Sequence, residues 1–134
     1  MDVNMEHSEH DSYIKKTNKM IIIQFRKALS DQYNTIETEG YIDINKNSEI
    51  AGVELLHLAY DAGRHIFEGF DFDKFNNEVQ AKATYDPQAD GFYIKFPLDP
   101  SVPLIIGRYV PCAVIVDNKG HLLRLEVYIS KAVD

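Results

Sequence analysis

Alternation of apolar and polar residues in several short runs constrains the fold of this chain more than any other feature. Residues 92–96 and 123–129 show it most clearly, with an apolar side chain at every second position. That period places the apolar side chains on one face of a β-strand. Turn-forming residues precede these runs, at 86–91 and 117–120. The sequence therefore predicts hairpins of antiparallel strands.

The two halves of the chain repeat one another at an offset of 72 residues. Residues 42–48 align with residues 114–120, and residues 50–55 align with residues 122–127. Each half then contains a strand, a long connector and a hairpin. We interpret this alignment as an internal duplication of one strand–hairpin unit.

Residues 20–30 fit either a strand or a helix. Their first part is short and rich in β-branched residues, as strands are. A helix that continues through Ala28 and Leu29 competes with that interpretation. The repeat places Ile22 over Ile94, which lies in a clearly alternating run. This alignment favours the strand.

Residues 55–69 carry the one extended helical pattern. Apolar residues recur there at the spacing of one helix face, at Leu55, Leu58, Ala59, Ala62 and Ile66. Gly69 is suited to ending such a helix. We therefore predict an α+β fold, mostly antiparallel β in two similar strand–hairpin units with one principal helix between them.

The length of 134 residues indicates a single domain over residues 1–134. Within it we expect a polar leader in residues 1–18. The first strand unit and the helix then occupy residues 19–70, and the second strand unit occupies residues 78–134.

Residues 80–132 resemble a small bacterial domain family of unknown function. Residues 85–96 read YDPQADGFYIKF, similar to the opening of that family, YDPEADALYIRL. Residues 114–127 read VIVDNKGHLLRLEV, similar to its closing hairpin, VIVDYDEDGRIVGIEIL. Arg124 stands where the family usually has glycine. The resemblance implies a small antiparallel meander, here in tandem with a diverged first copy, and it implies no catalytic residues.

The charge balance weighs against nucleic acid as a direct partner. Acidic residues number 21 against 14 basic ones, and the net charge is −7, whereas phosphate contacts need clustered Lys and Arg. No apolar run approaches the roughly 18–20 residues that span a bilayer, so we expect no membrane partner. The polar, acidic start of the sequence and the single cysteine favour a cytoplasmic protein.

Sequence motifs for common chemistries are absent. The chain has no GxGxxG, GxxxxGK[ST], HExxH, CxxC or GxSxG pattern. We therefore predict no catalytic residues, no metal site and no cofactor. Cys112 lies in an apolar run and is interpreted as a small buried hydrophobic residue.

Two carboxylate pairs leave alternatives open. Asp86 and Asp90 bracket a turn, where Asx hydrogen bonding explains them, although paired carboxylates also serve acid–base chemistry or cation binding. Glu54 and Glu126 occupy matching places in the two hairpins. They either face solvent or face one another across a groove. An enzyme built on these four residues and on histidines is our least favoured hypothesis.

Acidic residues interleaved with phenylalanines follow the predicted helix. Between Lys46 and Lys74 the only basic residue is Arg64. Aromatic anchors supply burial in protein interfaces, and carboxylates steer a basic partner. The predicted partner-binding residues are therefore Asp61, Glu68, Phe70, Asp71, Phe72 and Asp73. The alternative is a solvated helix with its phenylalanines folded inward.

These observations lead to two hypotheses about function. The first is a non-enzymatic acidic inhibitor, an immunity protein or antitoxin that binds and neutralises a basic toxin such as a nuclease. Nuclease toxins tend to be basic because they bind phosphates. The second is a β-rich scaffold or small-ligand-binding module, either monomeric or homodimeric.

Overall fold

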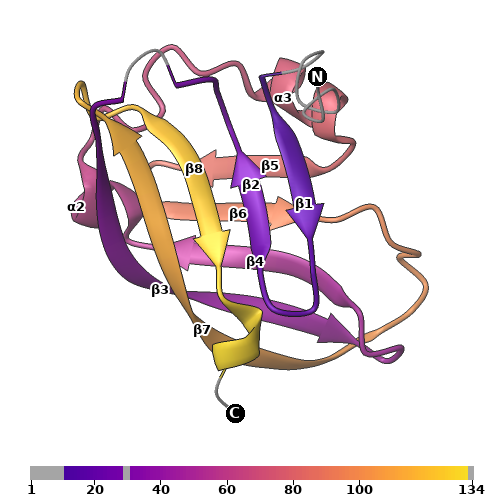
Figure 1. Cartoon of the computed structure of the whole chain (residues 1–134). Helices are drawn as coiled ribbons and strands as arrows, with labels where there is room; N and C mark the ends of the chain where they lie inside the picture. Colours follow the sequence, from indigo (N-terminus) through magenta and orange to yellow (C-terminus); the bar gives the residue numbers. More distant parts are fainter. Residues whose placement is uncertain (1–10, 29–30, 133–134) are drawn as a thin grey trace, which may run out of the picture.

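One curled sheet of eight antiparallel strands forms most of the molecule, in the order β1-β2-β8-β7-β3-β4-β6-β5 (Figure 1). The structure is a computed structural model, and it describes residues 11–28 and 31–132. The strands are β1 (Tyr13–Lys16), β2 (Ile21–Gln24), β3 (Tyr33–Asn45), β4 (Ile50–Leu56), β5 (Lys82–Asp86), β6 (Gly91–Lys95), β7 (Leu104–Asp117) and β8 (Leu122–Val127). β1 lies in the stretch expected to be a polar leader, whereas residues 1–10 lie outside the described residues.

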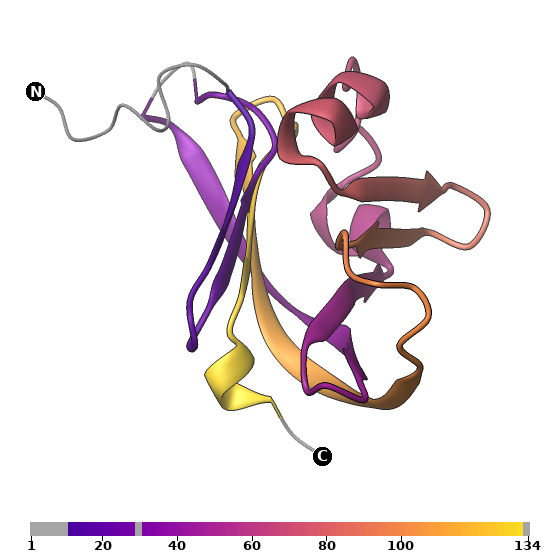
Figure 2. The ribbon, with the colours of Figure 1, turned by 90° about the vertical axis from the view of Figure 1, so that its right-hand side faces the viewer.

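The two long central strands give the sheet its curvature. β3 has 13 residues and β7 has 14, and both bend from one side of the molecule to the other (Figure 2). As a result, β1, β2 and β8 face β4, β5 and β6 across a shared core. Alternate side chains fill this core, among them Ile23, Val53, Phe92 and Val114, each fully buried.

The fold is mainly β, and the prediction of an α+β fold is wrong. Of the described residues, strands hold 48% and helices 13%. The predicted helix over residues 55–69 is also wrong, because Leu55 belongs to β4 and the helix α2 (Leu58–Ala62) has only five residues. Gly63 ends α2 with a φ of 107°, a conformation that glycine adopts without strain. The apolar spacing arises from a strand end, a short helix and turns.

A second helix, α3 (Phe72–Val79), lies in a stretch for which we predicted no helix. Asp71 caps it, accepting a hydrogen bond of 3.0 Å from the backbone N–H of Lys74. Phe75 points inward from α3 and stacks on Phe25 with ring centroids 5.0 Å apart. An Asx residue followed by apolar positions at 72, 75 and 79 was the signal for this helix.

The sheet order is symmetric under exchange of the two halves of the chain. If β1 is exchanged with β5, β2 with β6, β3 with β7 and β4 with β8, the result is the same strand order read from the opposite edge of the sheet. The β3–β7 register keeps this symmetry, because the pair Glu37–Ala113 shifted by 72 residues becomes the observed pair Tyr109–Tyr41. The pair Glu39–Pro111 is its own counterpart. A pseudo-two-fold axis therefore passes between β3 and β7 at Glu39.

The alignment of Ile22 with Ile94 is displaced by one residue in the structure. Ile22 pairs with Glu126, whereas Glu54, the counterpart of Glu126, pairs with Tyr93. The true counterpart of Ile22 is Tyr93, and a shift of one residue exchanges the two faces of a strand. Residues 21–24 nevertheless form a strand, which confirms the preference for β over helix there.

The pairing of β2 with β8 and of β6 with β4 interlocks the two units. The β1–β2 hairpin of the first unit pairs with β8 of the second, and the β5–β6 hairpin of the second unit pairs with β4 of the first. Both halves of the chain therefore contribute to one core. None of the helices in the described residues is long and apolar enough to cross a membrane.

Candidate functional site

The phenylalanines of the predicted patch around α2 and α3 pack against the hydrophobic core. Phe70 and Phe72 are partly buried, with ring centroids 4.8 Å apart in an edge-on contact. Phe67 lies 5.1 Å from Phe72 and 5.5 Å from Phe92, so these rings continue the hydrophobic core. Such rings hold α3 and the preceding loop against the sheet. This packing leaves little aromatic area for a partner.

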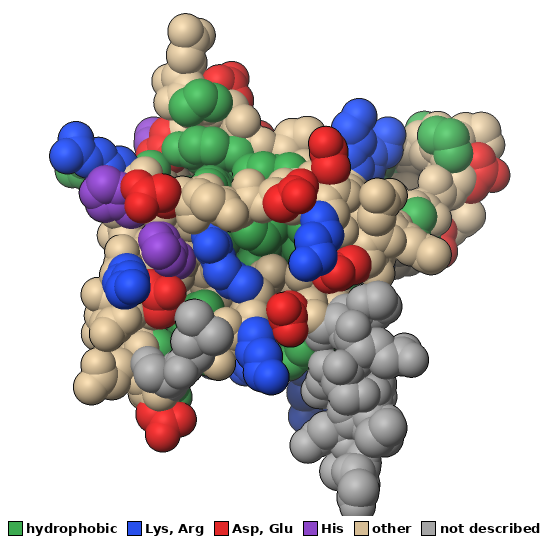
Figure 3. Space-filling model, turned by 90° about the horizontal axis from the view of Figure 1, so that it is seen from above, with side chains coloured by type: hydrophobic (Ala, Val, Ile, Leu, Met, Phe, Trp, Pro, Cys, Tyr) green, Lys and Arg blue, Asp and Glu red, His purple; other side chains and the backbone are tan. Residues whose placement is uncertain are grey.

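The carboxylates of this patch are exposed, and most have a structural partner. Asp71 caps α3, and Asp61 accepts a hydrogen bond of 2.9 Å from the Thr38 hydroxyl. Glu68 lies 2.9 Å from His65 Nδ1. Figure 3 shows that side chains of both signs and histidines alternate on this end of the molecule. The strongly acidic segment of the sequence is thus mixed in charge once folded.

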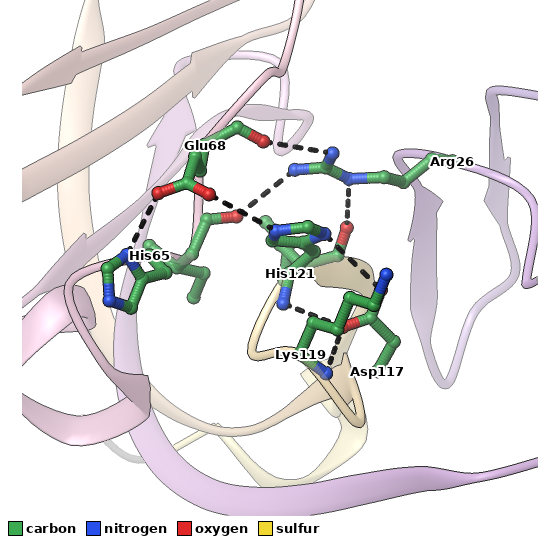
Figure 4. Close-up of polar contacts among 8 residues, drawn as sticks. Arg26, His65, Glu68, Asp117, Lys119 and His121 are labelled. Atoms are coloured by element: carbon green, nitrogen blue, oxygen red, sulfur yellow. Dashed lines mark hydrogen bonds and ion pairs between the residues drawn. The ribbon is translucent and has the colours of Figure 1, made fainter.

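A polar cluster joins Glu68 to the β7–β8 turn (Figure 4). His121 Nε2 lies 3.9 Å from Glu68 Oε1, and His121 Nδ1 lies 3.5 Å from Asp117 Oδ2. Burial works to raise the pKa of Asp117, but hydrogen bonds from the backbone of His121 and Lys119 outweigh it and lower that pKa. The Asp117 carboxylate therefore stabilises the turn.

Arg26 fastens the loop between α2 and α3 to the sheet. Its guanidinium donates to the carbonyl oxygens of Leu122, Ile66 and Glu68 at 2.9, 3.2 and 3.3 Å. A planar group with several fixed donors suits a set of carbonyls on separate segments. These bonds give Arg26 a structural role (Figure 4).

Asp86 and Asp90 stabilise different structures. Asp86 accepts a hydrogen bond of 3.0 Å from the backbone of Gln88, as the Asx-turn interpretation predicted. Asp90 accepts from the backbone N–H groups of Ala59 and Tyr60 at 2.8 and 2.9 Å and thereby caps α2. It also accepts a 2.6 Å hydrogen bond from the Tyr85 hydroxyl.

Carboxylates and tyrosines gather on the face of the sheet that points away from the core. We call this surface, on the four central strands β8, β7, β3 and β4, the outer acidic face. Alternation with the buried residues places Glu37, Glu39, Asp43, Glu54 and Glu126 on it. The one basic side chain among the described strand positions of this face is Arg124.

Glu54 and Glu126 lie on this same face as symmetric counterparts. A row of paired residues, Glu54, Tyr41 and Tyr109, crosses three strands, and the rings of Tyr41 and Tyr109 lie 5.1 Å apart. β3 and β7 lie between the two glutamates, so these carboxylates belong to one broad surface. That surface was not predicted, because Glu37 and Glu39 lie in a stretch that we interpreted as a connector. The alternation of residues 36–44 was the available signal.

The hydroxyl groups of Tyr93 and Tyr128, which border the outer acidic face, stay protonated at neutral pH. Burial and the nearby Asp43 carboxylate raise the pKa of Tyr93 to about 12. A hydrogen bond to Glu126, with burial, raises the pKa of Tyr128 to about 12. The negative charge of the surface therefore comes from its carboxylates, and these tyrosines act as donors to them.

A pocket of about 300 Å³ opens on this face, next to the end of β2 and the start of β3. Its floor is a row of paired residues across four strands, Gln24, Arg124, Ile115 and Thr35. Its remaining lining residues are Ala28, Tyr33, Leu123 and Glu126. The pocket mixes charged, aromatic and aliphatic groups, as small-molecule sites do.

Comparisons with known proteins give no relative from which a role could be carried over. No family model matches the sequence, and neither a curated protein nor a solved structure matches it significantly. The resemblance of residues 80–132 to a bacterial domain family stays a prediction. In the part of the chain that the structure describes, no group of three or more potential metal ligands is found.

Proposed function

We propose that this chain is a non-enzymatic acidic binding protein that covers the basic surface of a partner and so inhibits it, as an immunity protein or antitoxin does. The outer acidic face is the observation that carries this proposal. It combines a row of carboxylates on adjacent central strands with exposed tyrosines.

Tyrosine supplies the anchoring part of such an interface. The side chains of Tyr33 and Tyr109 are 58% and 55% exposed, although they lie on central strands. Exposed tyrosines bring a large apolar area and a hydroxyl group, and they are enriched among the residues that dominate binding energy.

The carboxylates define the class of partner. Glu37 and Glu39 are exposed and lie on one strand, two residues apart. Their field attracts a basic protein and accelerates association. Proteins that bind nucleic acid present such basic surfaces, because they must neutralise phosphates. A nuclease-type toxin is therefore the partner class that this surface fits best.

The experiment is to identify the partner and then locate its binding surface. The immobilised chain would capture proteins from its native organism at low salt, and a salt gradient would release them for mass spectrometry. The association rate of the purified partner is then measured against ionic strength. We expect a basic protein whose association rate falls by about tenfold or more as salt rises.

Two variants of equal net charge locate the surface. The double variant Glu37→Lys with Glu39→Lys reverses charge on the outer acidic face. The double variant Asp61→Lys with Asp73→Lys reverses charge around α2 and α3. We expect only the first to slow association, by about tenfold. If association slowed only in the variant with Asp61→Lys and Asp73→Lys, the partner would bind the end of the molecule that carries α2 and α3. That result would overturn the assignment to the outer acidic face.

A further inference from the structure

The pocket lined by Gln24, Tyr33 and Arg124 has a counterpart at the symmetry-related place on the sheet, where two tyrosine rings of the chain fill the corresponding space. A Cβ atom at Gly52 would overlap the hydroxyl of Tyr93, and one at Gly107 would overlap the ring of Tyr41. Two tyrosines therefore cover two glycines on the outer side of β4 and β7.

At the symmetry-related place on the sheet, all four of these residues are replaced. Arg124 and Thr35 stand at the positions that correspond to Gly52 and Gly107, and Ile22 and Ala113 stand at the positions of Tyr93 and Tyr41. The covering rings are gone, and a guanidinium and a hydroxyl take the place of bare backbone. The resulting space is the 300 Å³ pocket.

Hydrogen bonds hold the polar side of this pocket in one geometry. Arg124 donates from Nε to Gln24 Oε1 at 2.9 Å and from Nη1 to Glu126 Oε2 at 3.3 Å. Gln24 in turn donates to the Arg26 carbonyl at 2.7 Å, and Tyr128 donates to Glu126 Oε1 at 2.7 Å. Nη2 of Arg124 has no hydrogen-bond partner among the described residues. The guanidinium is thus held in one position, and its Nη2 group can still donate a hydrogen bond to a ligand.

The charges of the pocket favour an uncharged ligand. Glu126 already neutralises Arg124, so an added carboxylate would be repelled by Glu126 and an added ammonium by Arg124. A guanidinium N–H beside a carboxylate oxygen presents a donor next to an acceptor. The complement of that pair is a carbonyl next to an N–H, which is the lactam edge of an oxopurine or oxopyrimidine ring.

The remaining lining suits a flat ring. Tyr33 offers an aromatic ring, and Ile115, Leu123 and Ala28 offer aliphatic surface. Base rings stack on such side chains, and stacking on aromatic groups contributes substantially to binding. The volume lies at the lower end of ligand pockets, which excludes large cofactors and accommodates one base.

We propose that this pocket binds a nucleobase or nucleoside through its lactam edge. The ligand's keto oxygen accepts a hydrogen bond from Arg124 Nη2, and its ring N–H donates to the Glu126 carboxylate. The ring lies between Tyr33 and the aliphatic floor. This inference adds a small-molecule site to the proposed function and does not depend on a protein partner.

The test is a titration of the isotopically labelled full chain with inosine, followed by NMR. We expect saturable shifts of the amide signals of Thr35, Ile115, Arg124 and Glu126. 1-Methylinosine, which lacks the ring N–H, should bind about tenfold more weakly or worse, because it leaves Glu126 without its donor. Equal affinity for the two nucleosides would overturn the proposed edge recognition, and the absence of shifts at millimolar inosine would overturn the site.

Matched variants separate the pocket from general charge effects. Arg124→Met and Lys95→Met each remove one positive charge from the outer side of the sheet. Lys95 is the counterpart of Gln24 and lies in the other half. We expect Arg124→Met to weaken inosine binding by about tenfold or more and Lys95→Met to leave it unchanged.

A filling variant and an anion probe complete the design. Thr35→Trp adds a ring at an exposed position of the pocket floor, so the fold survives and inosine binding is lost. An unchanged inosine affinity in this variant would contradict the proposed location. Benzoate serves as the anionic probe, and saturable binding of benzoate with no binding of inosine would identify a carboxylate site and overturn the proposed ligand class.

Discussion

The sulfur atom of Cys112 lies against Gly40, and these two residues are counterparts under the 72-residue repeat. A Cβ built on Gly40 would lie 2.9 Å from Cys112 Sγ and 2.9 Å from Leu55 Cδ2. Both residues are buried close to the pseudo-two-fold axis. The two counterpart side chains compete for one space, so only one of the two positions can carry a side chain.

Gly40→Ala should destabilise the protein by about 1–3 kcal/mol, the usual cost of overpacking a core. Urea unfolding measures this change. Cys112→Ala should restore part of the loss when combined with it, because the sulfur is one of the atoms that the new methyl group meets. Gly91→Ala is the control, since its nearest side-chain atom lies 3.9 Å away. An equal cost of Gly40→Ala in both backgrounds would contradict the competition for space.

The Cys112 thiol should be inert in the folded protein. Burial raises its pKa to about 12, so the reactive thiolate is scarce at pH 8. Ellman's reagent should label Cys112 only after urea unfolds the chain, at the rate of unfolding. Complete labelling of the native protein within minutes would show that the thiol is accessible.

Asp90→Ala should cost more stability than Asp86→Ala. Asp90 caps α2 and binds Tyr85, whereas Asp86 holds only a turn at the surface. Loss of a cap costs about 1–2 kcal/mol, and thermal or urea unfolding of the two variants measures the difference. Equal losses would mean that the turn, and not the cap, matters.

The contribution of Asp90 should depend on pH. Burial works to raise the Asp90 pKa, but hydrogen bonds from Tyr85 and from the backbone of α2 outweigh it, and the pKa in the folded state is lowered. A lowered folded-state pKa gives stability that is complete above the unfolded pKa and is lost as the pH falls through the folded value. The stability gap between the wild type and Asp90→Asn should therefore shrink on acidification below about pH 4. A gap that widens in acid would contradict this linkage.

Arg26→Ala should loosen the loop between α2 and α3. The change removes the donor of three carbonyl oxygens on two separate segments, and we expect a loss of about 2 kcal/mol. Hydrogen exchange at Leu122, whose N–H binds the Ile66 carbonyl, should quicken. Arg26→Lys should not restore stability, because a lysine ammonium lacks the planar fork. Full rescue by lysine would show that charge alone suffices.

Much of the local structure could be predicted from the sequence. The alternation in residues 92–96 and 123–129 predicted β6 and β8, and both are confirmed. The turn assignment of Asp86 is also confirmed. The prediction of a helix over residues 55–69 was wrong because the same apolar spacing arises where Leu55 lies near the end of a strand and Leu58 begins a short helix. Periodicity over a few residues cannot separate these cases.

The functional surfaces depend on pairings that no local pattern contains. Glu54 and Glu126 are 72 residues apart in the sequence, and only the order β4-β3-β7-β8 brings them to one face. Arg26 binds carbonyls about 40 and 96 residues away. The acidic segment near α2 lost its uniform charge for the same reason, because Arg26 and His121 fold against Glu68.

The sequence by itself determined the alternation of the strands, the turns between them and the likeness of the two halves, because each of these depends on neighbouring residues. Tertiary structure alone decided that β2 crosses to β8 and β6 to β4. It also decided which counterpart near the axis keeps a side chain, and where tyrosine rings cover the sheet or leave a pocket. Those outcomes depend on which segments, distant in the sequence, pack together and exclude water. The free energy of that burial is gained only when the whole core assembles, so no local stretch of sequence contains it.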